Sequence, residues 1–106
     1  MVEQPTPDRE RTIARILSAE REIRLLGVRR LALFGSVVRG EAHPGSDVDL
    51  LVEFVPGHKS FERYLDLADL LERTIGHRID LVTVESLSPF LGPHILAEAT
   101  DVLRAA

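Results

Sequence analysis

Two aspartates separated by one residue, Asp47 and Asp49, are the residues of this chain best placed to do chemistry. If residues 47–53 form a strand, side chains at positions i and i+2 project from the same face, about 7 Å apart along the chain. Two carboxylates with that spacing can bind one divalent cation. The apolar run over residues 50–52 is typical of a buried strand, which would hold the pair on a rigid element.

A third carboxylate, Asp80, lies in the strand-like segment Arg-Ile-Asp-Leu-Val-Thr over residues 78–83. An aspartate among apolar strand residues is costly to bury unless a cation or a hydrogen bond compensates it, so we expect it to join Asp47 and Asp49. Three carboxylates supply the oxygen ligands that Mg²⁺ and Mn²⁺ prefer, and their charge of roughly −3 could hold two such ions together with a triphosphate. The predicted chemistry is two-metal nucleotidyl transfer, in which Asp80 helps to activate the attacking hydroxyl.

A glycine-serine turn precedes the acidic pair and suits phosphate binding. Gly35 lets the backbone approach a phosphate closely, and Ser36 can donate from its hydroxyl and its amide. Arg39 lies three residues further on the same helical face and could fork onto phosphate or onto a neighbouring acid. Ser46, directly before the first aspartate, could orient the carboxylates or the phosphates. The segment is not a Walker-type phosphate loop, because its spacing and its Gly-Lys-Ser/Thr end are missing.

The elements that would position these residues alternate between helical and strand patterns. This predicts an α/β or α+β fold in which helices flank a mixed β-sheet. Asp8 is the predicted N-cap of an amphipathic helix over residues 9–26. A strand over residues 28–34 leads to the glycine-serine turn, and strands over residues 47–53 and 78–84 carry the three aspartates.

The second half of the chain supplies two further helices and an edge strand. Ser60 is the predicted N-cap of the first of these helices. Its apolar stripe, which we expect to face the core, is Phe61, Tyr64, Leu65, Ala68 and Leu71. Pro93 should begin a last helix through about residue 99, followed by an edge strand over residues 101–103. We expect a docking patch for a partner on this last helix and over residues 87–93, where Pro89, Phe90 and Leu91 would be exposed.

Size and composition restrict the possible functions. The 106 residues predict one domain over residues 8–106 after a flexible tail over residues 1–7, with no room for a second substrate-binding domain. The chain has no cysteine, no signal-peptide pattern and no apolar run long enough to span a membrane, so we expect a cytoplasmic protein that does not bind membranes. A net charge of −4 with dispersed arginines argues against binding long nucleic acids.

A resemblance to a known family rests on two segments and one distant residue. These are Gly-Ser-Val-Val-Arg-Gly over residues 35–40, Ser-Asp-Val-Asp-Leu-Leu-Val over residues 46–52, and Asp80. Together they resemble the minimal nucleotidyltransferases of the DNA polymerase beta superfamily, which carry a third metal-binding aspartate at the position of Asp80. The resemblance spans residues 10–100. Gly45 departs from the polar or acidic residue of many relatives, which alters the loop but removes no metal ligand.

The resemblance implies a nucleotidyltransferase fold and transfer of AMP from ATP to a hydroxyl with two Mg²⁺ or Mn²⁺ ions. The implied metal ligands are Asp47, Asp49 and Asp80, and the implied nucleotide-binding residues are Gly35, Ser36, Arg39 and Ser46. Members of the family commonly act as antitoxins in hetero-oligomers with a HEPN-domain toxin and can adenylylate a tyrosine of that toxin. The length of the chain fits this arrangement, since a partner would supply the acceptor.

Each of these residues also has a purely structural interpretation. Asp47 and Asp49 could be solvent-facing acids beside a turn. Asp80 could pair with Arg78, and Arg39 could brace its own loop. The glycine and serine could serve only turn geometry and helix capping.

Three functions therefore remain open. The first is an adenylyltransferase that modifies a partner protein, and the second is an antitoxin that neutralises its toxin by binding alone. The third is a nucleotidyltransferase that acts on a small molecule such as an aminoglycoside. The three intact aspartates count against the second, and the missing acceptor domain counts against the third.

Overall fold

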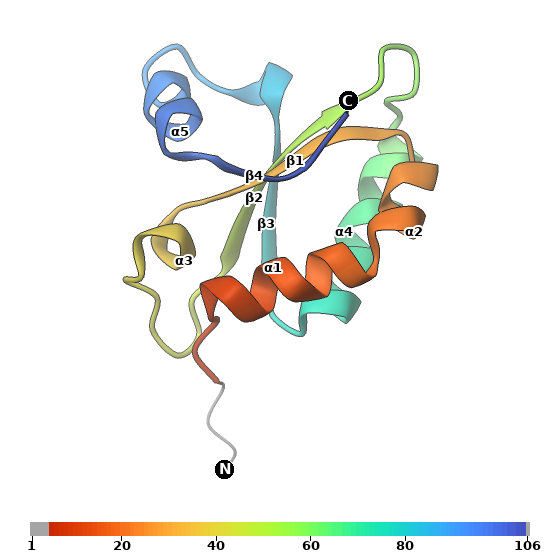
Figure 1. Cartoon of the computed structure of the whole chain (residues 1–106). Coiled ribbons are helices and arrows are strands. Elements are labelled where there is room, and N and C mark those ends of the chain that lie inside the picture. The colour runs from red at the N-terminus through yellow and green to blue at the C-terminus, as the bar shows by residue number, and fades with distance from the viewer. Residues whose placement is uncertain (1–4, 106) are drawn as a thin grey trace.

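A four-stranded mixed sheet in the order β3-β2-β1-β4 is the frame of this computed structural model, which describes residues 5–105 (Figure 1). β1 (Val28–Phe34) pairs antiparallel with β2 (Val48–Phe54) and with β4 (Thr100–Arg104). β2 and β3 (Ile79–Thr83) run parallel, because helix α4 (Phe61–Ile75) carries the chain back between them. The predicted mixed sheet is confirmed.

Helices cover both faces of this sheet (Figure 1). The remaining helical elements are α1 (Arg9–Ser18), α2 (Glu20–Leu25), α3 (Ser36–Arg39), the 3-10 turn η1 (Val84–Ser86) and α5 (Gly92–Glu98). The larger core cluster joins side chains of α1, α2 and α4 to one face of the sheet, whereas Ile95 of α5 packs on the other face. Strand side chains alternate between these two clusters: Leu50 faces the larger one and Leu51 the smaller one.

The predicted helix over residues 9–26 is divided in two at Ala19. The Ser18 hydroxyl donates a hydrogen bond of 2.6 Å to the Arg15 carbonyl, the acceptor that the Ala19 N–H would use in a continuous helix. The Ala19 N–H instead donates to the Ile16 carbonyl at 3.0 Å. The predicted caps are confirmed at both long helices, where the side chains of Asp8 and Ser60 each accept from a backbone N–H three residues ahead.

The second strand begins one residue later than predicted, at Val48. Asp47 therefore lies outside the strand and is exposed, whereas Asp49 is the second residue of the strand and is partly buried. By strand alternation Asp49 shares the face of Leu51, and Asp80 shares the face of Val82. Both of these apolar residues belong to the cluster that α5 covers, so these two aspartates lie on that face of the sheet.

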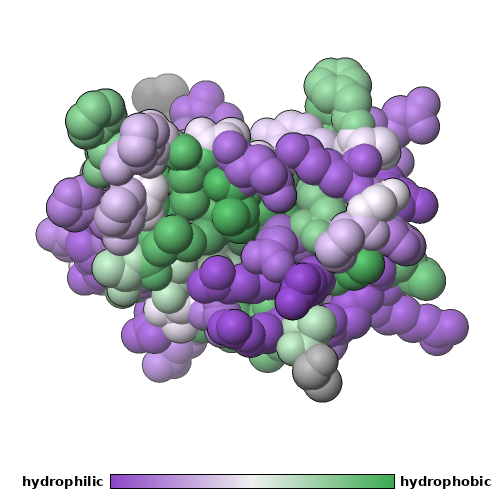
Figure 2. Space-filling view, turned by 90° about the horizontal axis from the view of Figure 1, so that it is seen from above, coloured by the Kyte–Doolittle hydropathy of each residue, from purple (hydrophilic) through white to green (hydrophobic). Residues whose placement is uncertain are grey.

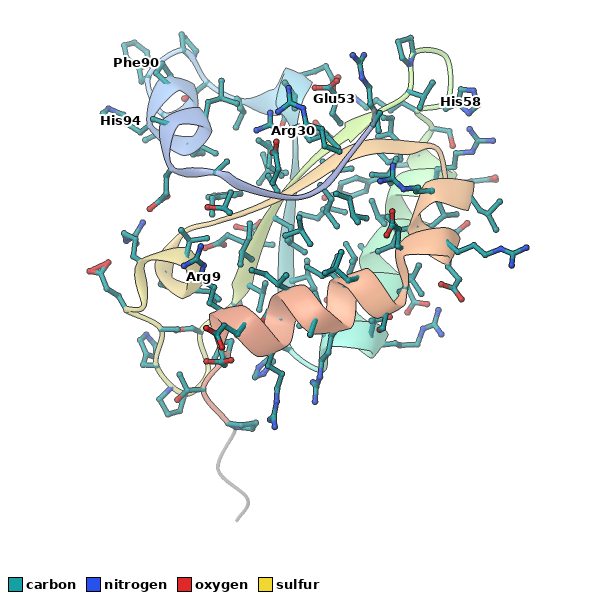
Figure 3. The ribbon with its side chains drawn as sticks, viewed as in Figure 1. Arg9, Arg30, Glu53, His58, Phe90 and His94 are labelled. Carbon is teal, nitrogen blue, oxygen red and sulfur yellow. The ribbon has the colours of Figure 1, made fainter. Side chains whose placement is uncertain are left out.

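The apolar stripe predicted on α4 is only partly in the core. Leu71 is buried as expected, but Phe61 is 75% exposed and Leu65 is 49% exposed, and Leu67 takes the core position. The exposure predicted over residues 87–93 is confirmed: Phe90, 83% exposed, projects outward beside His94 at the α5 end of the molecule (Figure 3). Apolar side chains bordered by hydrophilic ones are also visible on the face shown in Figure 2.

The flexible tail predicted over residues 1–7 stays a prediction, because residues 1–4 lie outside the described residues. Residues 5–8 precede α1 without regular secondary structure, and Pro7 is buried. Among the helices of residues 5–105, none combines the length and the apolar character that crossing a bilayer requires.

Candidate active site

The site is built on the first residues of two parallel strands. Asp49 of β2 and Asp80 of β3 are direct register partners, and Asp80 is close enough to raise the pKa of Asp49. The start of β2 is tied to the start of β3 because the Val48 N–H donates to the Arg78 carbonyl at 2.9 Å. The fold thus brings together two carboxylates that are 31 residues apart in sequence.

Asp49 has the perturbed electrostatics of a functional carboxylate. Its pKa is raised from 3.8 to about 6, mainly by burial and in addition by the negative charges of Asp80 and Asp47. The positive charge of Arg39 opposes the effect, which places this arginine within electrostatic reach. A carboxylate destabilised by burial and by like charges is the environment in which a bound cation is most favourable.

Asp80 itself is exposed on β3, an edge strand of the sheet. The expectation of a buried aspartate that needs compensation is therefore wrong for this residue, because the site lies open on the outer strand. The alternative pairing with Arg78 is also not found. Arg78 instead approaches Asp47, with 3.3 Å between Arg78 Nε and Asp47 Oδ1, and both side chains are largely solvated.

The arrangement of the three carboxylates bears directly on metal binding. Within residues 5–105 no three His, Cys, Asp or Glu side chains are gathered as a metal-ion cluster, since Asp47 is turned toward Arg78. Asp49 and Asp80 are the two members of the predicted set of three that the sheet places side by side. Asp47 is exposed and its ion pair with Arg78 is weak, so little free energy holds its side chain in this position. Carboxylate oxygens are ligands that hard divalent cations prefer, and the raised pKa of Asp49 indicates a site where positive charge would be stabilised.

Gly35 closes the site from the β1 side. Its φ of 80° and ψ of −156° lie in a region that L side chains rarely adopt. A Cβ atom added here would lie 2.0 Å from Asp49 Oδ2. The absence of a side chain therefore lets the turn lie directly against the carboxylate. The sequence interpretation, close approach to phosphate, did not anticipate this contact.

The two serines lie where their hydroxyls can donate. Ser36 begins α3 and is partly buried, and its side chain makes no hydrogen bond to any residue of the described chain. Ser46 Oγ accepts a hydrogen bond of 2.9 Å from the His43 N–H, which closes the loop that carries Gly45. An accepting hydroxyl keeps its own proton for a further acceptor.

Arg39 is held by two glutamates that sequence analysis did not identify. Its Nε lies 2.5 Å from Glu41 Oε1, and its Nη1 pairs with Glu98 Oε1. Glu98 Oε2 in addition accepts from the Gly35 N–H at 3.1 Å. The neighbouring acid expected for Arg39 is thus found. Glu41 was within reach of a local pattern, but Glu98 is 59 residues away and no spacing rule could have found it.

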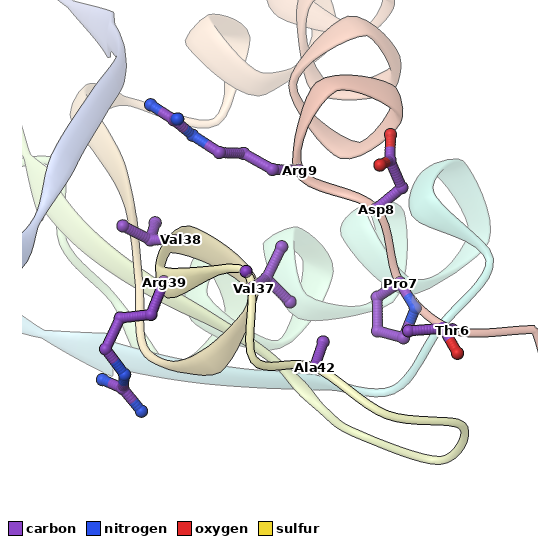
Figure 4. A pocket seen from close by; sticks show the side chains of 9 residues that line it. Thr6, Pro7, Asp8, Arg9, Val37, Val38, Arg39 and Ala42 are labelled. Atoms are coloured by element: carbon purple, nitrogen blue, oxygen red, sulfur yellow. The ribbon is translucent and has the colours of Figure 1, made fainter.

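A hollow of about 520 Å³ adjoins α3 beside the arginine (Figure 4). Its lining residues are Thr6, Pro7, Asp8, Arg9, Val37, Val38, Arg39, Gly40 and Ala42. Apolar side chains of α3 line it together with Arg9, Arg39 and Asp8, so its lining carries both signs of charge (Figure 4). None of the three aspartates lines the hollow, which shares only Arg39 with the predicted site.

Comparison with known proteins agrees with this geometry. The nucleotidyltransferase domain family matches residues 11–102. The chain belongs to this family. Protein adenylyltransferase MntA of Thermococcus cleftensis is 42% identical to this nucleotidyltransferase over 94 residues, which cover 85% of this chain and 92% of the relative. All seven predicted site residues of the nucleotidyltransferase lie inside the matched region.

Solved structures share the fold of this nucleotidyltransferase. One assigned to a minimal nucleotidyltransferase superimposes with a TM-score of 0.77 at 38% identity, covering 88% of this chain and 94% of that one. The MNT antitoxin fold in a complex with a tri-AMPylated HEPN toxin from Shewanella oneidensis superimposes with a TM-score of 0.64 at 18% identity, covering 92% and 73%. The predicted nucleotidyltransferase fold is thereby confirmed.

Proposed function

We propose that this nucleotidyltransferase transfers AMP from ATP to the hydroxyl of a tyrosine in a HEPN-domain toxin. It would thereby act as the antitoxin of a toxin-antitoxin pair. The observation that carries the proposal is the Asp49–Asp80 carboxyl pair on adjacent parallel strands, closed by Gly35 and faced by Arg39. The relative that is a protein adenylyltransferase supports the donor and the class of acceptor. We expect the reaction in the cytoplasm, where nucleoside triphosphates are available.

The site residues take separate roles in this proposal. Asp47, Asp49 and Asp80 would hold divalent cations, which we take to be two Mg²⁺ or Mn²⁺ ions. When bound, such cations neutralise triphosphate charge and lower the pKa of the attacking hydroxyl. Gly35, Ser36, Arg39 and Ser46 would bind the triphosphate through backbone and hydroxyl donors and the guanidinium.

The proposed transfer is an in-line displacement at the α-phosphorus. The acceptor oxygen forms a bond to this phosphorus while the bond to the oxygen that bridges to the β-phosphate breaks. Pyrophosphate leaves with that electron pair. The hydroxyl proton passes to a carboxylate of the site. Asp80 is our candidate for it, because it is exposed beside Asp49 on the edge strand, where an acceptor from another molecule can approach.

The acceptor would come from outside this small domain. The site opens on the face of the sheet that α5 covers, and the exposed Phe90 and Leu91 precede α5. Exposed apolar side chains next to a site are typical of a surface that docks a partner. The HEPN toxin found with the structurally similar MNT antitoxin is the partner class we propose.

Labelling with ATP tests the proposal. The protein is incubated with α-labelled ATP and Mg²⁺, with and without a HEPN-domain protein, and label on either chain is measured. Wild-type protein should label the partner. A variant with Asp47→Asn and Asp49→Asn should lose labelling by at least about a hundredfold, because cation binding is lost. Asp69→Asn on α4, an exposed aspartate paired with Arg73, is the matched control and should keep full labelling.

The same experiment separates the alternatives. Neutralisation of the toxin by the double variant, with no label in any reaction, would refute enzymatic modification in favour of binding alone. Label that appears only on an added aminoglycoside would favour a small-molecule acceptor. Label on the partner that persists in the double variant would place the catalytic site elsewhere.

A further inference from the structure

We propose that Glu98 is a positioning residue of the nucleotide site, whose carboxylate joins the Gly35 turn to the Arg39 guanidinium and holds both ready for the triphosphate. The inference rests on the proposed function, because it assigns a role in that same site. Glu98 would act through its two partners without touching the nucleotide.

A single carboxylate makes both contacts. Oε2 accepts the Gly35 N–H at 3.1 Å, and Oε1 pairs with Arg39 Nη1. Charge-assisted hydrogen bonds of this kind are stronger and more directional than neutral ones. The Glu98 side chain is only 24% exposed, whereas that of Arg39 is 50% exposed, so the brace lies behind the arginine. Arg39 lowers the pKa of Glu98, so the pair favours the ionised carboxylate.

The backbone of Glu98 is anchored to the same strand that leads into the turn. Glu98 is the last residue of α5, and β4 begins two residues later at Thr100, which pairs with Leu33 of β1. Ile95 and Ala99 on either side pack on the smaller core cluster. A side chain mounted this way has a fixed origin relative to Gly35. Such a side chain is better suited to holding its partners in place than to moving away when the nucleotide binds.

The brace leaves Arg39 able to bind phosphate. A guanidinium has five N–H donors, and the two glutamates engage Nε and Nη1. Nη2 donates to no residue within the described chain. The turn held by Glu98 also abuts Asp49, since Gly35 has no room for even a Cβ on that side. Loss of the Glu98 carboxylate would therefore loosen both the Arg39 side chain and the Gly35 turn that lies against Asp49.

The opposite role is a competing anion that occupies the phosphate donors and must be displaced. The two roles predict opposite effects on affinity. A positioning residue strengthens the binding of MgATP, whereas a competitor weakens it. Glu98→Gln distinguishes them, because it keeps the shape and an acceptor for Gly35 but removes the charge that holds Arg39.

The affinity of the full chain for MgATP is measured by calorimetry in wild type, Glu98→Gln, Arg39→Ala and the double variant. We expect Glu98→Gln to weaken binding about tenfold and to have less than about a twofold further effect once Arg39 is absent, since coupled residues are not additive. Glu98→Asp, which keeps the charge on a shorter arm, should be weakened less. Glu85→Gln, a glutamate paired with Lys59 beyond the far end of β3, is the matched control and should bind normally.

A second measurement does not depend on nucleotide. The amide nitrogen and proton shifts of Gly35 in the nucleotide-free protein should move in Glu98→Gln and stay in place in Glu85→Gln. Unchanged or tighter MgATP binding by Glu98→Gln, or an equal loss with and without Arg39, overturns the inference while the proposed function stands. Failure of wild type and every variant to bind MgATP overturns both.

Discussion

Asp49 and Asp80 are direct register partners across the parallel strands β2 and β3, and the negative charge of Asp80 raises the pKa of Asp49. The pairing depends on strand register, because a slip of one residue would turn one carboxylate to the opposite face. It concentrates like charge at the edge of the sheet, where solvent and a second molecule have access. Four tests follow from this geometry and from the core that supports it.

The pH dependence of stability should change in Asp49→Asn. The pKa of Asp49 is raised from 3.8 to about 6, first by burial and then by Asp80. Below pH 3.8 the group is protonated in both states, so it contributes nothing. As the pH rises through this window the unfolded chain releases its proton first, and the folded state loses stability until about pH 6. The variant lacks this loss.

Urea unfolding in EDTA measures the effect. After allowance for solvent screening of a partly buried group, Asp49→Asn should exceed wild type by about 1 kcal/mol above roughly pH 7 and by much less near pH 4. A difference that does not vary with pH would mean that the raised pKa is absent from the folded protein. The variant should also lose the thermal stabilisation that Mg²⁺ and ATP give to wild type.

Arg78 should compete with divalent cations for Asp47. The pair is exposed and 3.3 Å apart, so Arg78→Gln should change the free energy of unfolding by less than about 0.5 kcal/mol. Removing the positive charge should tighten Mn²⁺ binding about two- to threefold at low salt, an effect that salt screens. Arg73→Gln, which breaks the exposed pair with Asp69, is the matched control. Weaker Mn²⁺ binding after Arg78→Gln would show that the arginine supports the site.

Gly35→Ala should damage the protein far more than an alanine at another left-handed glycine. The new Cβ would meet Asp49 Oδ2 at 2.0 Å, so the turn or the carboxylate must move. We expect a loss of about 2 to 4 kcal/mol and of MgATP binding. Gly57→Ala is the control, because its φ is 82° but nothing lies within 4 Å. It should cost only about 1 kcal/mol. Equal losses at the two glycines would rule out the contact with Asp49.

The corrected core face of α4 can be tested with two leucines. Leu67 is fully buried, and its replacement by alanine should cost about 2 to 5 kcal/mol through lost burial and a cavity. Leu65 is 49% exposed, so Leu65→Ala should change stability by no more than about 0.5 kcal/mol. Denaturant midpoints with a common m-value give both numbers. Similar losses of stability in the two variants would mean that Leu65 is buried in the core, as the sequence pattern predicted.

Local chemistry made much of the fold predictable from sequence. The caps at Asp8 and Ser60 and the strand over residues 28–34 follow from short-range patterns, and the structure confirms them. The break at Ala19 was not predicted: there the Ser18 hydroxyl donates to the Arg15 carbonyl, and the Ala19 N–H donates to Ile16 instead. The core face of α4 was assigned wrongly because several apolar residues lay within reach of one stripe, and only packing against the sheet chose among them.

The candidate site divides in the same way. The sequence by itself determined which residue types are present for cation and phosphate chemistry, since Gly35, Ser36 and the two aspartates lie close together in the chain. The sequence also predicted that Asp80 would join the acidic pair. Only the tertiary structure decided that Asp80 is the register partner of Asp49, that Asp47 turns to Arg78, and that the Glu98 side chain contacts Gly35 and Arg39. Those contacts join residues that are far apart in the sequence. They exist because strand register and helix packing bring distant segments together, which no local spacing encodes.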